Sequence, residues 1–141
     1  MINIIIITHG EFGAYLVEAA EGIAAVLGTD DSFGGLCVGI SARMSVVEVR
    51  GRLSEALERV RGKGEMIVVT DMPGGTPANV AIPLLKDRPE VPVISGVNLY
   101  MLVTAFNYRK TAATASELAE KMLSAGQRAV SNIRVLLAGR A

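Results

Sequence analysis

Residues 2–10 read Ile2-Asn3-Ile4-Ile5-Ile6-Ile7-Thr8-His9-Gly10. The apolar part, Ile2–Ile7, is rich in β-branched side chains and shows no alternation of apolar and polar residues. This pattern predicts a strand that is covered on both faces. Parallel sheets contain such strands, because the helical crossovers between parallel strands cover the sheet above and below. Thr8-His9-Gly10 then stands where a buried strand ends.

Apolar strands and amphipathic helices continue to alternate along the chain. Further strands are predicted at Gly34–Ile40, Met66–Thr70 and Val91–Ser95. Helices are predicted at residues 12–27, Met44–Arg61, roughly Thr76–Lys86, 99–107 and 116–130. In the first two helices the apolar spacing places these residues inward: Phe12, Leu16, Ala19 or Ala20, Ile23 and Leu27, then Val46, Val49, Leu53, Leu57 and Val60. Gly28 is a predicted stop for the first helix.

This alternation predicts an α/β fold with an open, mostly parallel sheet of order 2-1-3-4. Helices are expected on both faces, because right-handed crossovers place successive helices above and below the sheet. The apolar tail Ile133–Leu137 predicts a late strand. It would pair antiparallel within its own sheet or extend to another subunit.

Composition narrows the class of protein. The chain has 141 residues, of which 50% are hydrophobic and 20% charged, with a formal net charge of zero. These values predict one globular domain over residues 1–141 and disfavour both disorder and charge-driven nucleic-acid binding. No apolar run approaches the roughly 18–20 residues of a membrane-spanning helix, and the first run has no signal-peptide features. We therefore expect a cytoplasmic location.

Cys37 and His9 are the only cysteine and the only histidine. One cysteine excludes an internal disulfide and a thiolate metal cluster, and one histidine excludes every site that needs two. Cys37 lies in an apolar run, where a buried core thiol is expected rather than a nucleophile. We predict no metal site and no cofactor.

The ends of the first and third predicted strands hold the main candidates for chemistry. Ligands of open α/β sheets bind beyond the carboxyl ends of the strands, where the strand order reverses. With the order 2-1-3-4, His9 and Asp71 end neighbouring strands, which lie about 4.7–4.9 Å apart. A carboxylate that binds one imidazole nitrogen fixes the tautomer and leaves the other nitrogen free to attack. His9 is thus a candidate nucleophile; the alternative is a histidine that only hydrogen-bonds the backbone.

A glycine-rich segment, Asp71-Met72-Pro73-Gly74-Gly75-Thr76, follows the third strand. Its glycines allow close approach of the backbone, Thr76 can cap the next helix, and Pro77 suits a first helical turn. The free N–H groups of a helix N-terminus attract anions. Together with His9 and the lack of a basic cluster, this segment predicts a phosphoryl group that is carried on the protein.

Three segments together resemble the signature segments of the enzyme IIA domain of mannose-family sugar phosphotransferase systems. They are Thr8-His9-Gly10, Asp71-Met72-Pro73-Gly74-Gly75-Thr76-Pro77-Ala78-Asn79 and Gly96-Val97-Asn98-Leu99. The resemblance implies that His9 accepts a phosphoryl group from the histidine-containing phosphocarrier protein and passes it to an enzyme IIB domain. Asp71 would be the hydrogen-bonding partner of His9. The phosphate-binding residues would be Gly10, Gly74, Gly75 and Thr76.

The same resemblance implies a homodimer that exchanges its last strand, with membrane contact only through the transport complex. One position departs from the family pattern, because Tyr100 stands where a proline is common. Its ring either packs on the neighbouring loop or changes the surface on which partners dock. Asn98 and Tyr100 are therefore candidate partner-binding residues.

Other functions are compatible with parts of the pattern. Histidine phosphatases also phosphorylate a histidine, but they need a second histidine and an arginine beside the first, and Thr8 occupies that place. The phosphotransfer subunit of dihydroxyacetone kinase has a similar first domain, with His-Ser where this chain has His9-Gly10. A regulatory or non-catalytic module that binds a phosphate-bearing ligand is the alternative from another class.

Overall fold

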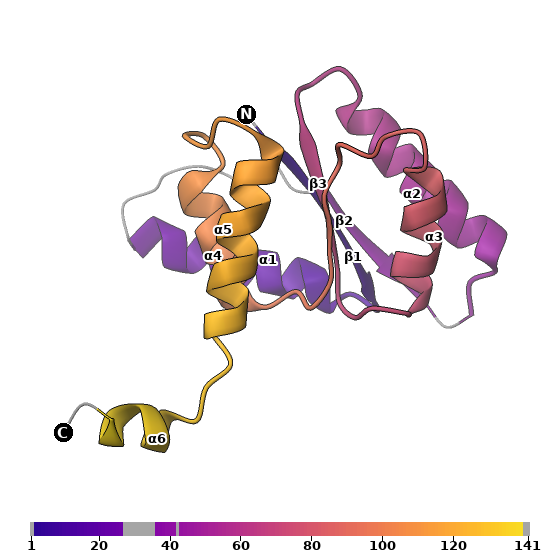
Figure 1. Ribbon diagram of the computed structural model, residues 1–141. Helices are drawn as coiled ribbons and strands as arrows, with labels where there is room; N and C mark the ends of the chain where they lie inside the picture. Colours follow the sequence, from indigo (N-terminus) through magenta and orange to yellow (C-terminus); the bar gives the residue numbers. More distant parts are fainter. Residues whose placement is uncertain (1, 27–35, 42, 140–141) are drawn as a thin grey trace.

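A computed structural model describes residues 2–26, 36–41 and 43–139 of the chain (Figure 1). The strands are β1 (Asn3–His9), β2 (Leu36–Ile40), β3 (Met66–Thr70) and β4 (Val93–Ile94). The helices are α1 (Phe12–Val26), α2 (Val46–Val60), α3 (Thr76–Leu84), α4 (Leu99–Tyr108), α5 (Ala115–Arg128) and α6 (Ile133–Ala138). The predicted start of the second strand at Gly34, and Leu27 and Gly28 at the end of the first helix, lie outside the described residues.

The four strands form one parallel sheet in the order β2-β1-β3-β4, which confirms the predicted order. On one side β1 pairs His9 with Ile40, and on the other it pairs Ile7 with Thr70. Asp71, which follows Thr70, is therefore level with Thr8, one residue before His9. This register brings the two candidate residues to the same edge.

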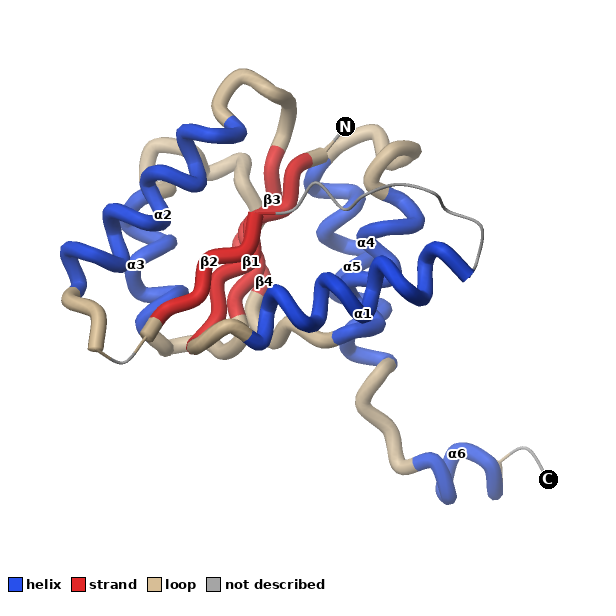
Figure 2. The backbone as a smooth tube through the Cα atoms, turned by 180° about the vertical axis from the view of Figure 1, so that it is seen from behind, coloured by secondary structure: helices blue, strands red, loops and turns tan. Residues whose placement is uncertain are grey.

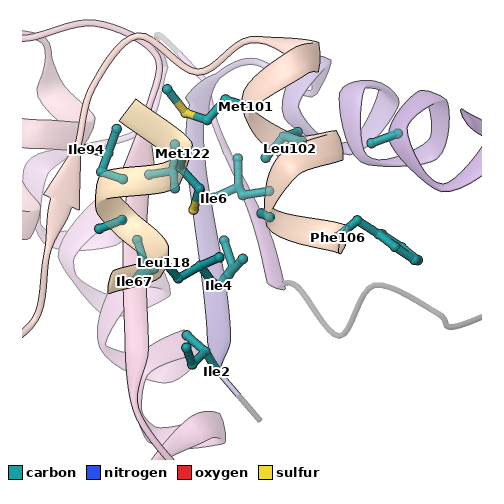
Figure 3. Packing of buried hydrophobic residues seen from close by; sticks show 14 of the residues in the cluster. Ile2, Ile4, Ile6, Ile67, Ile94, Met101, Leu102, Phe106, Leu118 and Met122 are labelled. Atoms are coloured by element: carbon teal, nitrogen blue, oxygen red, sulfur yellow. The ribbon is translucent and has the colours of Figure 1, made fainter. Parts of the chain in front are cut away.

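Two hydrophobic cores cover the sheet, one on each face. In β1 the buried side chains alternate, because Ile4 and Ile6 belong to one core and Ile5 and Ile7 to the other. The first core packs α1, α4 and α5 against the sheet, and α2 and α3 cover the opposite face (Figure 2). Figure 3 shows the first core, in which Leu102 of α4 and Met122 of α5 pack beside Ile6. The expected helices on both faces are confirmed.

The inward faces of α1 and α2 differ in part from the prediction. The apolar spacing predicts that Phe12, Ile23 and Val46 point inward, yet they are 41%, 39% and 57% exposed. The buried face of α1 consists of Val17, Ala20 and Ala24. These three residues belong to the first core, and Leu16 is partly buried against it. In α2, Val49, Leu53 and Val60 are buried as predicted.

The fourth strand is shorter than Val91–Ser95. Only Val93 and Ile94 pair with β3, after which the chain turns at Gly96, where φ is +85°. The N–H groups of Gly96 and Val97 then donate to the carbonyls of Asp71 and Thr70 at 3.1 Å each. These two bonds attach the start of α4 to the edge of the sheet that carries Asp71.

The predicted strand at Ile133–Leu137 is wrong, because these residues form helix α6. Asn132 caps it, with its Oδ1 accepting hydrogen bonds from the N–H groups of Arg134 and Val135 at 3.1 and 3.4 Å. These local bonds satisfy the backbone without the neighbouring strand that an extended segment would need. The helix stands away from the domain (Figures 1 and 2), and none of its residues is buried.

The expectation of a buried thiol at Cys37 is also wrong. Cys37 is exposed and lies in β2, one of the two edge strands of the sheet. Whether a side chain of an edge strand is buried depends on what packs over that edge of the sheet. An apolar run in the sequence does not reveal this. None of the helices in the described residues is both long and apolar enough to cross a membrane.

Candidate active site

His9 and Asp71 lie together at the carboxyl edge of the sheet. Oδ2 of Asp71 accepts two hydrogen bonds, from the backbone N–H and from Nδ1 of His9, each at 2.8 Å. Its Oδ1 accepts a third from the N–H of Met72 at 2.9 Å. A carboxylate only accepts, so Nδ1 carries the proton and the Nε2 lone pair of the neutral ring stays free. The geometry predicted for this pair is confirmed.

The charge of Asp71 is maintained by its hydrogen bonds. Burial raises the pKa of Asp71, since the side chain is only 11% exposed. The bonds from the His9 backbone and ring, the attraction to His9 and the bond from Met72 together outweigh that effect. The net pKa of Asp71 lies below its ordinary value of 3.8. A carboxylate faces the imidazole at neutral pH, while the side chain of His9 is 46% exposed and accessible from solvent.

The N-terminus of α3 faces the imidazole through Gly75. A Cβ at this position would lie 2.8 Å from Cε1 and 3.4 Å from Nε2 of His9. Only a residue without a side chain lets the backbone come so close to the free ring nitrogen. Gly74 precedes it with φ at +75°, a conformation that favours glycine.

The first turn of α3 keeps donors that can bind an anion. Thr76 does not cap this helix as expected: the capping position is Gly75, which has no side chain to donate or accept, and Thr76 is the first helical residue. Among the described residues, no acceptor binds the N–H groups of Gly75 and Thr76. The α-carbon of Gly75 lies close to the imidazole, and the helix N-terminus adds the positive end of the helix dipole.

Asn79 supports this loop, a role that its place in the sequence does not reveal. Its Nδ2 donates to the carbonyl of Gly74 at 3.1 Å, and its backbone N–H donates to the carbonyl of Gly75 at 2.9 Å. Both carbonyls are thereby turned toward α3, so the N–H groups of the same two peptide bonds point away from that helix. In the sequence Asn79 is the last residue of the second signature-like segment, and that resemblance assigned it no role.

Gly10 has a conformational role in the turn after His9. Its φ is +68°, and its N–H donates to the carbonyl of Ile40 at 2.7 Å. That N–H is therefore engaged and is not a free donor for a ligand. Gly10 allows the chain to leave β1 and start α1 within a few residues.

Asn98 and Tyr100 occupy the start of α4. Oδ1 of Asn98 caps α4 through the N–H of Met101 at 3.0 Å, and its Nδ2 donates to the carbonyl of Gly126 in α5 at 3.2 Å. Tyr100 is 50% exposed and lines two hollows of about 420 and 490 Å³ beside α4. Neither hollow is lined by His9 or Asp71. Asn98 thus has a structural role at the start of α4, and Tyr100 is exposed on the same helix.

No group of three or more His, Cys, Asp or Glu side chains that could hold a metal ion occurs among residues 2–26, 36–41 and 43–139. The site consists of one imidazole, one carboxylate and a helix N-terminus. Such a set can bind and hold an anion against the imidazole nitrogen.

A family model, EIIA-man, described as the PTS system fructose IIA component, matches residues 3–123. The chain belongs to this family. The PTS is the phosphotransferase system, so membership identifies a sugar phosphotransferase component. A curated relative, the fructose-specific EIIA component of Bacillus subtilis (strain 168), is 25% identical over 110 residues, which are 78% of this chain and 72% of the relative.

Solved structures of other IIA proteins share the fold along nearly the whole chain. The EIIA component from Streptococcus agalactiae is 28% identical with a TM-score of 0.79, covering 96% of this chain and 99% of that one. The mannose/sorbose-specific IIA subunit from Enterococcus faecalis is 26% identical with a TM-score of 0.78, covering 92% of each chain. The expected resemblance to mannose-family IIA domains is confirmed.

Proposed function

We propose that this IIA protein carries a phosphoryl group on Nε2 of His9. The group would come from the histidine-containing phosphocarrier protein and pass to an enzyme IIB domain, in the uptake and phosphorylation of a sugar. One observation carries the proposal: the imidazole that Asp71 holds through Nδ1 directs Nε2 at the open N-terminus of α3, near the position of Gly75.

The imidazole neither gains nor loses a proton during the transfer. The Nε2 lone pair forms the new bond to phosphorus while the bond between phosphorus and the donor nitrogen breaks. Nδ1 keeps its proton, and the Asp71 carboxylate, 2.8 Å away, stabilises the positive charge that the ring gains. The onward step to the IIB domain reverses this sequence.

The phosphoryl oxygens would be bound by the start of α3. The N–H groups of Gly75 and Thr76 are open there, and Thr76, in the same first turn, is exposed. Gly74 would place this loop through its left-handed conformation. Gly10 would contribute through the turn rather than as a donor, because Ile40 already binds its N–H. These contacts position the group and compensate its charge without a metal ion.

Two further predictions concern the setting of the site. Partner proteins must reach His9, and its half-exposed side chain permits this. A homodimer remains our prediction. The segment that would form its interface is the helix α6 rather than a strand. Its exposed apolar side chains are those of Ile133, Val135, Leu136 and Leu137. A cytoplasmic location also remains a prediction.

The test follows phosphate on the protein. The purified chain is incubated with phosphoenolpyruvate, enzyme I and the phosphocarrier protein, and intact mass is measured at alkaline pH, where phosphohistidine is stable. We expect one acid-labile phosphate on the parent and none on His9→Gln. Equal incorporation by His9→Gln, or none by the parent, overturns the proposal. Mixing the phosphorylated protein with a mannose-family IIB domain then tests the onward step.

A further inference from the structure

The hydroxyl of Thr8 bridges the residues on either side of the turn that follows β1. Thr8 is 1% exposed, and its Oγ1 donates to the carbonyl of Gly10 at 3.0 Å. The same oxygen accepts a hydrogen bond from the N–H of Gly13 at 3.3 Å. The first of these bonds closes a ring across His9, whose backbone lies between the two bonded residues.

Two further hydrogen bonds fix the backbone of His9 and of the residue after it. Its own N–H donates to Asp71, and the N–H of Gly10 donates to Ile40. The backbone of His9 is thus fixed before, at and after the residue. With the backbone fixed, the ring can reach Oδ2 of Asp71 through Nδ1 in one orientation, which directs Nε2 toward α3.

Gly13 can lie against Thr8 because glycine has no side chain. A Cβ on Gly13 would lie 2.9 Å from Oγ1 and 3.0 Å from Cγ2 of Thr8, so only glycine lets α1 begin this close to the threonine. The N–H of Gly13 belongs to the first turn of α1 and has no partner within the helix. Thr8 satisfies it, so this hydrogen bond ties the first turn of α1 to the residue before His9.

We propose that Thr8 is a positioning residue for phosphoryl transfer at His9. Its hydroxyl holds the turn so that Nε2 points at the N-terminus of α3. Thr8 does not touch the reacting atoms, and the resemblance of Thr8-His9-Gly10 to a family segment assigns it no role of its own. The kinetic effect that we predict for Thr8 rests on the proposed function. The effect that we predict on the orientation of the ring does not.

The test compares Thr8→Val, which keeps the shape and removes the hydroxyl, with Thr8→Ser, which keeps the hydroxyl. Thr104→Val in α4 is the matched control, because it also removes a buried threonine hydroxyl, away from the site. Two readouts are taken: the rate of transfer from phosphorylated carrier protein, and the ¹⁵N NMR signals of the imidazole. The chain has one histidine, so both ring signals belong to His9 and only Nδ1 and Nε2 must be told apart.

Thr8→Val is expected to slow transfer about tenfold, because misplacement of a reacting group by a fraction of an ångström has effects of this order. Its ring signals should shift from the pure Nδ1–H form toward a mixture of tautomers. Thr8→Ser should stay within about threefold of the parent, and Thr104→Val should match the parent in both readouts.

Equal behaviour of Thr8→Val and Thr104→Val in both readouts overturns the proposal. A parent that takes up no phosphate would refute the proposed function, while the ring signals would still test Thr8. Gly13→Ala guards against a Thr8→Val protein that does not fold, since it keeps the hydroxyl but pushes against it. We expect the same change in the ring signals, and unchanged signals in Gly13→Ala would overturn the proposal.

Discussion

Replacing Gly75 by alanine tests the proposed phosphoryl site with one methyl group. The backbone of Gly75 has φ −81° and ψ 169°, which alanine adopts without strain. The new Cβ would lie 2.8 Å from Cε1 of His9 and 3.3 Å from Cγ of Met72. Ordinary contact begins near 3.4 Å, so the imidazole must retreat by about half an ångström or the loop must move away from it.

The effect on transfer should be larger than the effect on stability. A displacement of about 1 Å costs on the order of 100-fold in rate, so half that distance predicts about tenfold, or about 1.4 kcal/mol in the barrier. Alanine is a poorer N-cap than glycine, which removes at most about 1 kcal/mol of folding free energy and lowers the Tm by a few degrees. The fold should therefore persist while transfer slows.

Rapid-quench measurement of transfer from phosphorylated carrier protein provides the rate, and calorimetry provides the Tm. Gly51→Ala is the matched control, because a Cβ at Gly51 in α2 meets nothing within 4 Å. Alanine there should leave the rate unchanged and raise stability by about 0.5–1 kcal/mol. A Gly75→Ala protein that transfers as fast as Gly51→Ala would refute the assignment of the phosphoryl site to the place where Gly75 lies against His9.

Two other predictions concern Asp71 and α6. The folded state lowers the pKa of Asp71, so its stabilisation is complete above the ordinary value of 3.8 and is lost as pH falls through the lower folded-state pKa. Asp71→Asn should transfer more slowly and show a flatter Tm in this acidic range, and parallel Tm curves would count against the pairing. Truncation after residue 131 should yield a smaller species in sedimentation than the full chain, and should lower the Tm only by the stability that the dimer adds, because α6 buries nothing against its own domain. A monomeric full-length chain would contradict the predicted dimer.

The layered architecture was predictable because hydrophobic periodicity carries it. The run Ile2–Ile7 has the composition of a strand buried on both faces, and the structure divides its isoleucines between two cores. Once the order 2-1-3-4 holds, His9 and Asp71 must meet, because both follow neighbouring parallel strands. The site was therefore predictable to the level of which residues meet.

The orientation of helix faces was less predictable. Periodicity places Phe12 and Ile23 on the apolar side of α1, but the residues of α1 that are buried in the core are Val17, Ala20 and Ala24. Close packing favours small residues where backbones approach, and large apolar residues then cover the rim. A pattern of apolar residues reports a side of the helix and not the depth at which each residue lies.

The C-terminal segment shows where local and long-range preferences conflict. Ile133, Val135 and Leu137 alternate as in a strand, but a strand needs a neighbour that the sequence pattern does not supply. Asn132 provides a local alternative through two hydrogen bonds to the first turn of α6. This cap outweighs the alternation in a segment of which no residue is buried.

The three glycines of the site look alike in the sequence and are needed for different physical reasons. Gly10 and Gly74 have φ values of +68° and +75°, and a Cβ added at either would meet nothing within 4 Å, so alanine there would strain the backbone without touching His9. Gly75 has an ordinary φ, and its Cβ would collide with the ring. The same substitution therefore changes folding energy at Gly74 and the place of the imidazole at Gly75. Only the second effect acts on the chemistry directly, and for that reason the adjacent pair separates the stability of the loop from its role toward a phosphoryl group.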